Sequence, residues 1–164
     1  GEGFKLALET LGRVRLAQIG ARAVGKATRI LDLTVDYARH RSQFGKSIDQ
    51  FQMIQQMLAD SAIEINSARL ALLQTAWEAD HDRNVSARIS MIKVQAAETL
   101  CRVADRAVQI YGGLGYCRDL PIERYYRDAR IYRIYDGTSE IHRMVVARAI
   151  SKGDLNLYNL NFVS

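Results

Sequence analysis

The sequence predicts an all-α protein, an up-and-down bundle of about three long and two short helices. Apolar side chains recur at steps of three and four along most of the chain, which is the spacing of one helix face. The 164 residues include a single proline, and few stretches alternate apolar with polar residues as strands do. With 48% hydrophobic residues, a chain of this length fits one domain with a buried core.

The first long helix is expected from about Phe4 to Arg39. Its buried face should carry the side chains that repeat in register: Val24, Ala27, Leu31, Thr34 and Ala38. Small residues let two helix backbones approach closely, a role that we expect for Gly20, Ala21, Ala23 and Gly25. The periodicity then breaks over residues 40–49, where Gly45 supplies a turn.

Two more long helices are expected, from about Asp49 to Ala79 and from about Val85 to Tyr111, with a polar turn between them. The second helix repeats at Ile54, Leu58, Ser61, Ile65, Ala68, Leu72 and Thr75. The third repeats at Ile89, Ile92, Ala96, Leu100, Val103, Ala107 and Ile110. It should end before Gly112 and Gly113, because glycine readily adopts the left-handed conformation that terminates helices.

Two short helices complete the predicted bundle. Pro121 fits the first turn of a helix from about Leu120 to Ile131. Thr138 or Ser139 can cap a last helix that runs to about Ile150. The connections between all of these elements are short, which favours antiparallel neighbours in a bundle.

One bundle domain is expected over residues 1–152, followed by a polar, asparagine-rich tail over residues 153–164. The chain opens with Gly-Glu-Gly-Phe and not with methionine, so we expect a fragment, a processed product or an expressed domain. No apolar run approaches the ~18 residues of a membrane span, and no secretory signal opens the chain. We therefore expect a soluble protein.

The net charge of +5 comes from 23 basic and 18 acidic residues interspersed along the chain, which does not favour nucleic-acid binding. Cys101 and Cys117 lie in no C-x-x-C or Cys/His pattern. Neither a zinc site nor a disulfide framework is indicated, so we expect no metal and a reducing compartment.

A candidate phosphate-binding turn follows the first helix, with the sequence Arg41-Ser42-Gln43-Phe44-Gly45, and Phe51-Gln52 opens the second helix. A guanidinium can grip a pyrophosphate through paired hydrogen bonds, serine and glutamine add neutral donors, and an aromatic ring can lie against a flat heterocycle. A surface arginine beside a buried phenylalanine anchor is the alternative interpretation. The residues alone leave both open.

A glycine turn, Gln109-Ile110-Tyr111-Gly112-Gly113, closes the third helix. It is not a Rossmann dinucleotide loop, because that loop must follow a strand and open a helix. Glycine permits close approach of the backbone to a ligand, and it also ends helices. A ligand contact and a helix C-cap can therefore coexist here.

A third turn, Tyr135-Asp136-Gly137-Thr138-Ser139-Glu140, leads into the last helix. A helix N-terminus leaves unpaired backbone N–H groups and a partial positive charge, which favour an anionic or electron-rich ligand. Asp136 lies at the mouth of this site. It is either a carboxylate with a chemical role or a turn residue near a helix start.

The order of these motifs resembles the C-terminal helical domain of the flavin-dependent acyl-CoA dehydrogenases, in which Q-x-x-G-G and Y-[E/D]-G-T-S turns recur at about this separation. The resemblance covers nearly the whole chain. It implies an FAD cofactor, held mainly by a neighbouring subunit, whose diphosphate and adenosine are contacted by Arg41, Ser42, Gln43, Phe44, Phe51 and Gln52. Further FAD contacts are implied for Gln109, Gly112, Gly113, Thr138, Ser139 and Glu140, and substrate contacts for Tyr135 and Gly137.

The resemblance also implies that Asp136 is the catalytic base, which removes the hydrogen α to the thioester carbonyl while the β-hydrogen leaves as hydride to the flavin. The family's usual residue is glutamate, and a misplacement of about 1 Å can cost on the order of a hundredfold in rate. Three explanations stay open. The site is re-spaced for aspartate, as in the related nitroalkane oxidases; the base lies elsewhere; or the chain is a non-catalytic subunit.

The predicted function is the α,β-dehydrogenation of an acyl-CoA thioester in fatty acid metabolism. The alternatives are a non-catalytic subunit that lends FAD contacts to a dehydrogenase complex and a nitroalkane oxidase-like enzyme. The family implies a homodimer or homotetramer with an electron-transfer flavoprotein as electron acceptor, in the bacterial cytoplasm or the mitochondrial matrix. Its complete subunit has two further domains, so we expect the isolated chain not to turn over substrate.

Overall fold

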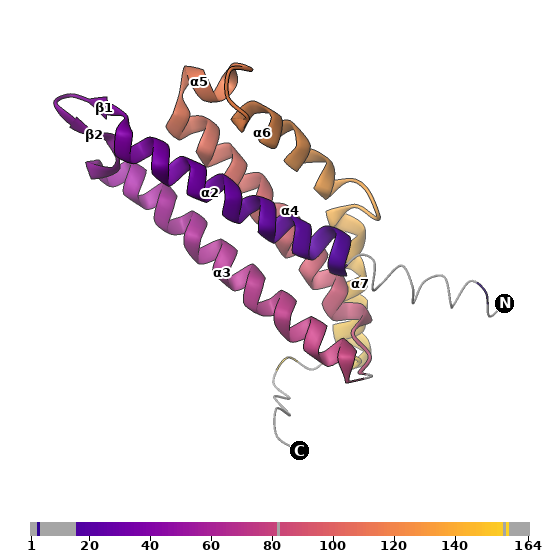
Figure 1. Cartoon of the computed structure of the whole chain (residues 1–164). Coiled ribbons are helices and arrows are strands. Elements are labelled where there is room, and N and C mark those ends of the chain that lie inside the picture. The colour runs from indigo at the N-terminus through magenta and orange to yellow at the C-terminus, as the bar shows by residue number, and fades with distance from the viewer. Residues whose placement is uncertain (1–2, 4–15, 82, 156, 158–164) are drawn as a thin grey trace.

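The computed structural model describes residues 3, 16–81, 83–155 and 157. Three long helices form the body of the bundle: α2 (Arg22–His40), α3 (Gln52–Asp80) and α4 (Ser86–Tyr111). Three shorter helices follow: α5 (Gly113–Tyr116), α6 (Ile122–Arg130) and α7 (Ser139–Lys152). Helix α4 is central, because α2, α3, α6 and α7 all pack against it (Figure 1). The prediction of an all-α bundle is confirmed.

The predicted apolar faces are the buried faces of the long helices. All seven repeating positions of the third predicted helix are buried in α4. In α2, four of the five predicted positions are buried, and Leu31 is partly buried. The first predicted helix began at about Phe4, but residues 4–15 lie outside the described part of the chain. Its described part starts as a π-helical turn, η1 (Leu16–Ala21), that runs directly into α2.

The small residues of the first helix have unequal roles. A Cβ added at Gly20 would lie 2.9 Å from both Leu72 and Ile92, so glycine is needed for this close approach. Ala23 is also fully buried. Ala21 and Gly25 are exposed, and no described atom lies within 4 Å of a Cβ added at Gly25. The expected packing role is therefore confirmed for Gly20 and Ala23, whereas no described helix uses Gly25.

The segment predicted as a simple turn after the first helix forms a small hairpin. Strands β1 (Ser42–Gln43) and β2 (Lys46–Ser47) pair antiparallel, and the 3-10 turn η2 (Ile48–Gln50) follows. Phe44 and Gly45 form the loop with φ angles of 52° and 82°. Positive φ at both residues is the pattern of a two-residue turn that matches the twist of a hairpin.

The ends of the short helices differ slightly from prediction. Helix α5 was not predicted, and α6 begins one residue after Pro121. Thr138 caps α7, as expected, because its side chain accepts a hydrogen bond from the Ile141 N–H at 3.3 Å. Much of the predicted tail, 153–164, lies outside the described residues.

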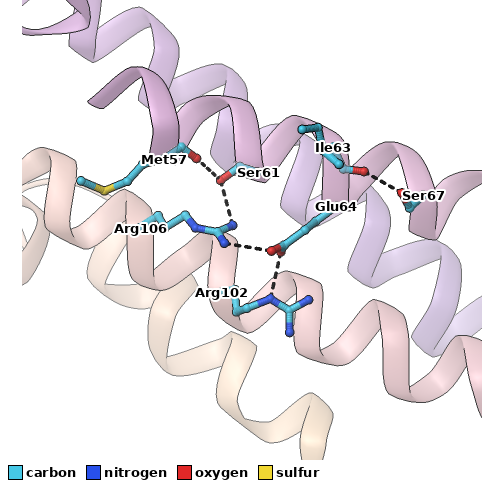
Figure 2. Close-up of polar contacts among 7 residues, drawn as sticks. All are labelled: Met57, Ser61, Ile63, Glu64, Ser67, Arg102 and Arg106. Carbon is cyan, nitrogen blue, oxygen red and sulfur yellow. Dashed lines mark hydrogen bonds and ion pairs between the residues drawn. The ribbon is translucent and has the colours of Figure 1, made fainter. Parts of the chain in front are cut away.

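A polar cluster joins α3 to α4 on one side of the bundle. Figure 2 shows Arg106 and Arg102 of α4 donating to the Glu64 carboxylate of α3, at 2.8 and 3.0 Å. Arg106 also reaches the Ser61 hydroxyl at 3.4 Å. Burial alone would raise the pKa of Glu64, but the hydrogen bonds from Arg106 and Arg102 outweigh it and lower that pKa. The cluster therefore fixes α3 against α4.

Candidate functional site

Two of the predicted cofactor motifs meet in one groove of ≈ 890 Å³ at the hairpin end of the bundle. The hairpin side contributes Arg41, Gln43, Phe44, Phe51 and Gln52 to its lining, and the glycine turn contributes Gly112 and Gly113. Ser42 and Gln109 are exposed nearby but lie outside its described lining. The structure thus brings together residues that are about 70 positions apart in sequence.

Aromatic rings and cations adjoin one another in this groove. Phe44 is 94% exposed, and its ring meets the Phe51 ring edge to face at 6.3 Å between centroids. The Lys46 ammonium lies 4.3 Å from the centre of the Phe51 ring. Such an exposed aromatic surface beside positive charge suits a flat heterocycle that carries phosphates.

Lys46 was missed by sequence reasoning, because its place beside Gln43 follows from the register of the hairpin. It pairs directly with Gln43 across the hairpin, and paired residues of an antiparallel ladder project to the same face. Recognising Phe44-Gly45 as a two-residue hairpin turn would have placed Lys46 beside Gln43. With Arg41, it gives the groove two cations, and none of the described lining residues is acidic.

The backbone around the groove is well anchored. The Arg41 N–H donates to the Tyr37 carbonyl at 2.9 Å, and the Arg41 carbonyl accepts from Ile48 at 2.8 Å. The Tyr37 and Tyr111 rings stack at 4.0 Å, and the Tyr111 hydroxyl donates to the Leu33 carbonyl at 2.8 Å. These contacts join the end of α2 to the end of α4 and hold the two sides of the groove together.

Gly112 ends α4 with φ 61° and ψ −138°. The positive φ confirms the expectation for this residue, but the ψ value places it outside the left-handed helical region, in a conformation that essentially only glycine adopts. A side chain here would therefore be strained whatever the space available. The turn keeps bare backbone at the mouth of the groove, which is what close approach to a ligand requires.

The Asp136 turn lies elsewhere in the molecule. Asp136 is exposed with φ 54°, and Gly137 follows with φ 90°. Asp is among the few side chains that tolerate this conformation. A hydrogen bond from its own backbone N–H, followed by one from Thr138, lowers the pKa of Glu140. Ser139 is fully buried, and among the described residues its hydroxyl has no hydrogen-bond partner.

Tyr135 enters the turn from the core side. Its ring meets the Tyr132 ring edge to face at 5.4 Å. Burial, assisted by Tyr132, raises the pKa of Tyr135 to about 12. Tyr135 therefore stays protonated at neutral pH.

His142, which sequence reasoning did not single out, contacts the backbone of the Asp136 turn. The imidazole is 5% exposed, with Nε2 at 3.0 Å from the Asp136 carbonyl oxygen and Nδ1 at 3.1 Å from the Ser90 hydroxyl of α4. The spacing of His142 from the turn gives no sequence signal for this contact, because it depends on how the chain reverses at Gly137.

The β1–β2 hairpin lies at one end of the bundle, and the link between α6 and α7, which carries the Asp136 turn, lies towards the other (Figure 1). The turn is tied to Ser90 near the start of α4, whereas the groove includes Tyr111 at the end of α4. A helix rises 1.5 Å per residue, so these two points are about 30 Å apart. The structure therefore brings the two cofactor motifs together, but it keeps both away from Asp136 within one chain.

The described part of the chain holds neither a metal-binding cluster nor a membrane-spanning helix. Its side chains include no group of three or more residues arranged to hold a metal ion. None of the helices described combines the length and the hydropathy that a membrane-spanning helix needs.

The fold defines an all-α bundle domain with a cationic, aromatic groove at one end and an exposed carboxylate on a turn towards the other. Residues 1–151 match the family model described as "Acyl-CoA dehydrogenase, C-terminal domain". The chain therefore belongs to the acyl-CoA dehydrogenase family, and it corresponds to the C-terminal domain that this model describes.

Named relatives agree with this assignment. Bovine mitochondrial short-chain specific acyl-CoA dehydrogenase is 43% identical over 152 residues, which are 93% of this chain and 37% of the relative. The structure of butyryl-CoA dehydrogenase from Megasphaera elsdenii superposes with a TM-score of 0.89 at 37% identity, over 92% of this chain and 39% of that one. A chain in the structure of the electron transferring flavoprotein of Acidaminococcus fermentans gives 0.88 at 42% identity, over 92% and 39%. This chain thus spans well under half of each.

Proposed function

We propose that this chain is the C-terminal domain of an FAD-dependent acyl-CoA dehydrogenase, which converts an acyl-CoA thioester to its α,β-unsaturated form. The observation that carries the proposal is the presence on one bundle of a groove with Arg41, Lys46 and two phenylalanines and of an exposed carboxylate on a turn with positive φ. Membership of the family supports both assignments.

The groove is the proposed contact for the diphosphate and adenosine of FAD. Arg41 and Lys46 would neutralise the diphosphate, and Phe44 and Phe51 offer ring faces and edges to the adenine. Gly112 and Gly113 leave room for backbone contact. The donor set fits such a ligand, because it combines cations and aromatic surface with no acidic side chain among the described lining residues.

Asp136 is the proposed base for the α-proton. Bound FAD supplies the hydride acceptor for the β-hydrogen, and the Asp136 carboxylate takes and holds the proton from the α-carbon. Thr138, Ser139 and Glu140 form the N-terminus of α7, which begins shortly after Asp136 and Gly137 in the sequence. Contact of Thr138 and Glu140 with the flavin, and of Tyr135 and Gly137 with the substrate, belongs to the same proposal. Ser139 is fully buried, so the flavin contact expected for it is not part of the proposal.

The stretch of α4 between Ser90, which anchors the Asp136 turn through His142, and Tyr111 in the groove is about 30 Å long, and this separation supports an oligomer. Asp136 and the groove of one chain would then belong to two different active sites. Each active site would combine Asp136 of one copy with the groove of a neighbouring copy. We infer a homodimer or homotetramer, and a strictly monomeric species of the full-length protein in sedimentation would contradict this. An electron-transfer flavoprotein is the proposed acceptor. The location is the cytoplasm of a bacterium or the mitochondrial matrix of a eukaryote, as the relatives' origins suggest.

The test uses the full-length protein that contains this domain. Asp136→Asn should keep FAD content nearly intact, because the amide preserves the shape of the side chain. Flavin bleaching by acyl-CoA in anaerobic rapid mixing should slow by about 10²–10⁴-fold, the usual contribution of a positioned general base. A wild-type rate of flavin bleaching in Asp136→Asn would refute the assignment of Asp136 as the base. Bleaching by a nitroalkane but by no acyl-CoA would favour the nitroalkane oxidase alternative, and no bleaching by the wild type would favour a non-catalytic subunit.

A further inference from the structure

The imidazole of His142 connects the Asp136 turn to the central helix. Its Nε2 lies 3.0 Å from the Asp136 carbonyl oxygen, and its Nδ1 lies 3.1 Å from the Ser90 hydroxyl. A carbonyl oxygen can only accept, so Nε2 carries a hydrogen and donates it. The ring is 5% exposed, which limits competition from water.

This contact holds an unusual stretch of backbone. Asp136 and Gly137 both have positive φ, at 54° and 90°. A Cβ added at Gly137 would lie 2.9 Å from His142 Nε2, so the ring packs directly against the glycine. The imidazole therefore fixes the peptide group that joins Asp136 to Gly137 by a hydrogen bond on one atom and by close packing on the next residue.

Both protonation states of His142 preserve this arrangement. In the neutral ring, Nδ1 accepts the Ser90 hydroxyl hydrogen. In the protonated ring, Nδ1 donates to Ser90, whose hydroxyl can then donate to the Ser86 carbonyl 3.3 Å away. The donor to Asp136 is Nε2–H in either case. A neutral side chain that places an N–H at the same point should therefore substitute for the imidazole.

We propose that His142 is the positioning residue for Asp136, an inference that rests on the proposed role of Asp136 as the base. An aspartate carboxylate has only two side-chain torsions, so its location follows the backbone closely. A displacement of about 1 Å can lower a rate on the order of a hundredfold. By fixing the Asp136 carbonyl, His142 fixes the direction in which the Asp136 side chain projects from the backbone.

The experiment compares two amides at position 142 in the full-length flavoprotein. Gln can place its N–H near the position of Nε2, whereas Asn is one methylene too short. Flavin bleaching per bound FAD at saturating acyl-CoA should stay within about threefold of wild type in His142→Gln and fall about 10–100-fold in His142→Asn. The substrate concentration for half-maximal bleaching and the FAD content should change little, because His142 is not expected to touch either ligand.

Equal rates in the Gln and Asn variants, whether fast or slow, would overturn the positioning role. If the Asn variant does not retain FAD, Ser90→Ala carries the test, since it leaves the ring in place and removes its anchor on α4. A slowing of about threefold or more supports the proposal, and an unchanged rate overturns it. Asp136→Asn is measured in parallel. If Asp136→Asn bleaches the flavin at the wild-type rate, Asp136 is not the base. If Asp136→Asn is slow but His142→Asn bleaches at the wild-type rate, Asp136 is the base and only the positioning role of His142 is refuted.

Discussion

Glu98 on α4 accepts a hydrogen bond from Arg133 at 3.0 Å, across 35 residues of sequence. The same carboxylate oxygen lies 3.5 Å from Arg143 of α7. Arg133 precedes the Asp136 turn, in the 3-10 turn η3 (Ile131–Arg133), and Arg143 follows it. One side chain of the central helix therefore holds both flanks of the turn that carries the proposed base.

Glu98→Gln should loosen that turn. The amide keeps the shape of the side chain but loses the charge that attracts two arginines, and a charge-assisted hydrogen bond contributes roughly 1.5–3 kcal/mol. Amide hydrogen exchange over residues 131–142 of the full-length protein should become about tenfold faster. Glu123→Gln is the matched control, because Glu123 pairs with Arg127 on an exposed helix face and should leave this exchange unchanged. Equal protection in wild type and Glu98→Gln would show that the contact does not hold the turn.

The cluster of Glu64, Arg102 and Arg106 in Figure 2 should make the free energy of unfolding decrease as the pH falls. The pKa of Glu64 is lowered in the folded protein, so its contribution is complete above the unfolded pKa of about 4.3 and is lost as pH falls through the folded value. Glu64→Gln should therefore lower the thermal unfolding midpoint at pH 7, and the gap to wild type should shrink below about pH 4.3. A gap that stays constant down to pH 3 would contradict the role of the Glu64 charge.

Arg41→Ala should weaken FAD retention in the full-length oligomer by about 10–100-fold, because a charge-assisted contact of roughly 1.5–3 kcal/mol is lost. Arg41→Lys should rescue only partly, since lysine cannot grip a diphosphate through two parallel bonds. Arg39→Ala is the matched control, because Arg39 is an exposed arginine of α2 outside the described lining of the groove. Flavin content after gel filtration is the measurement, and equal content in all variants would remove Arg41 from the site.

Asp136→Glu should slow flavin reduction by about tenfold or more. The longer side chain displaces the carboxylate by about 1 Å. In addition, Glu lacks the local hydrogen bonding that helps Asp adopt the positive φ of 54° observed here. Rapid mixing with acyl-CoA gives the rate. An increase in rate would instead identify a site that has degenerated from a glutamate enzyme.

The sequence predicted the long helices well because each buries a continuous apolar stripe. Ile89 and Leu100, for example, repeat in register on α4 and are buried as expected. The β1–β2 hairpin was missed because strands of two residues are too short to show alternation. Its turn could be recognised only from the backbone of Phe44, whose positive φ is unusual for an aromatic residue.

The candidate site was predicted in its parts but not in its arrangement. The motif residues Arg41 and Gly112 were identified from residue type and resemblance, and the structure places both in one groove. The roles of Lys46 and His142 depend on which residues the fold brings next to them. Residue type alone could not indicate that the His142 ring meets the Asp136 carbonyl, because that contact spans a chain reversal at two residues of positive φ.

The length of α4 between groove and base has a genetic consequence. If each active site takes its base from one chain and its groove from another, two different inactivating alleles can compensate for each other. A hybrid dimer of an Asp136→Asn chain and an Arg41→Ala chain contains one site with both lesions and one site with neither. Co-expression of the two alleles should therefore restore activity that neither shows alone, whereas two alleles that both alter the Asp136 turn should fail to complement.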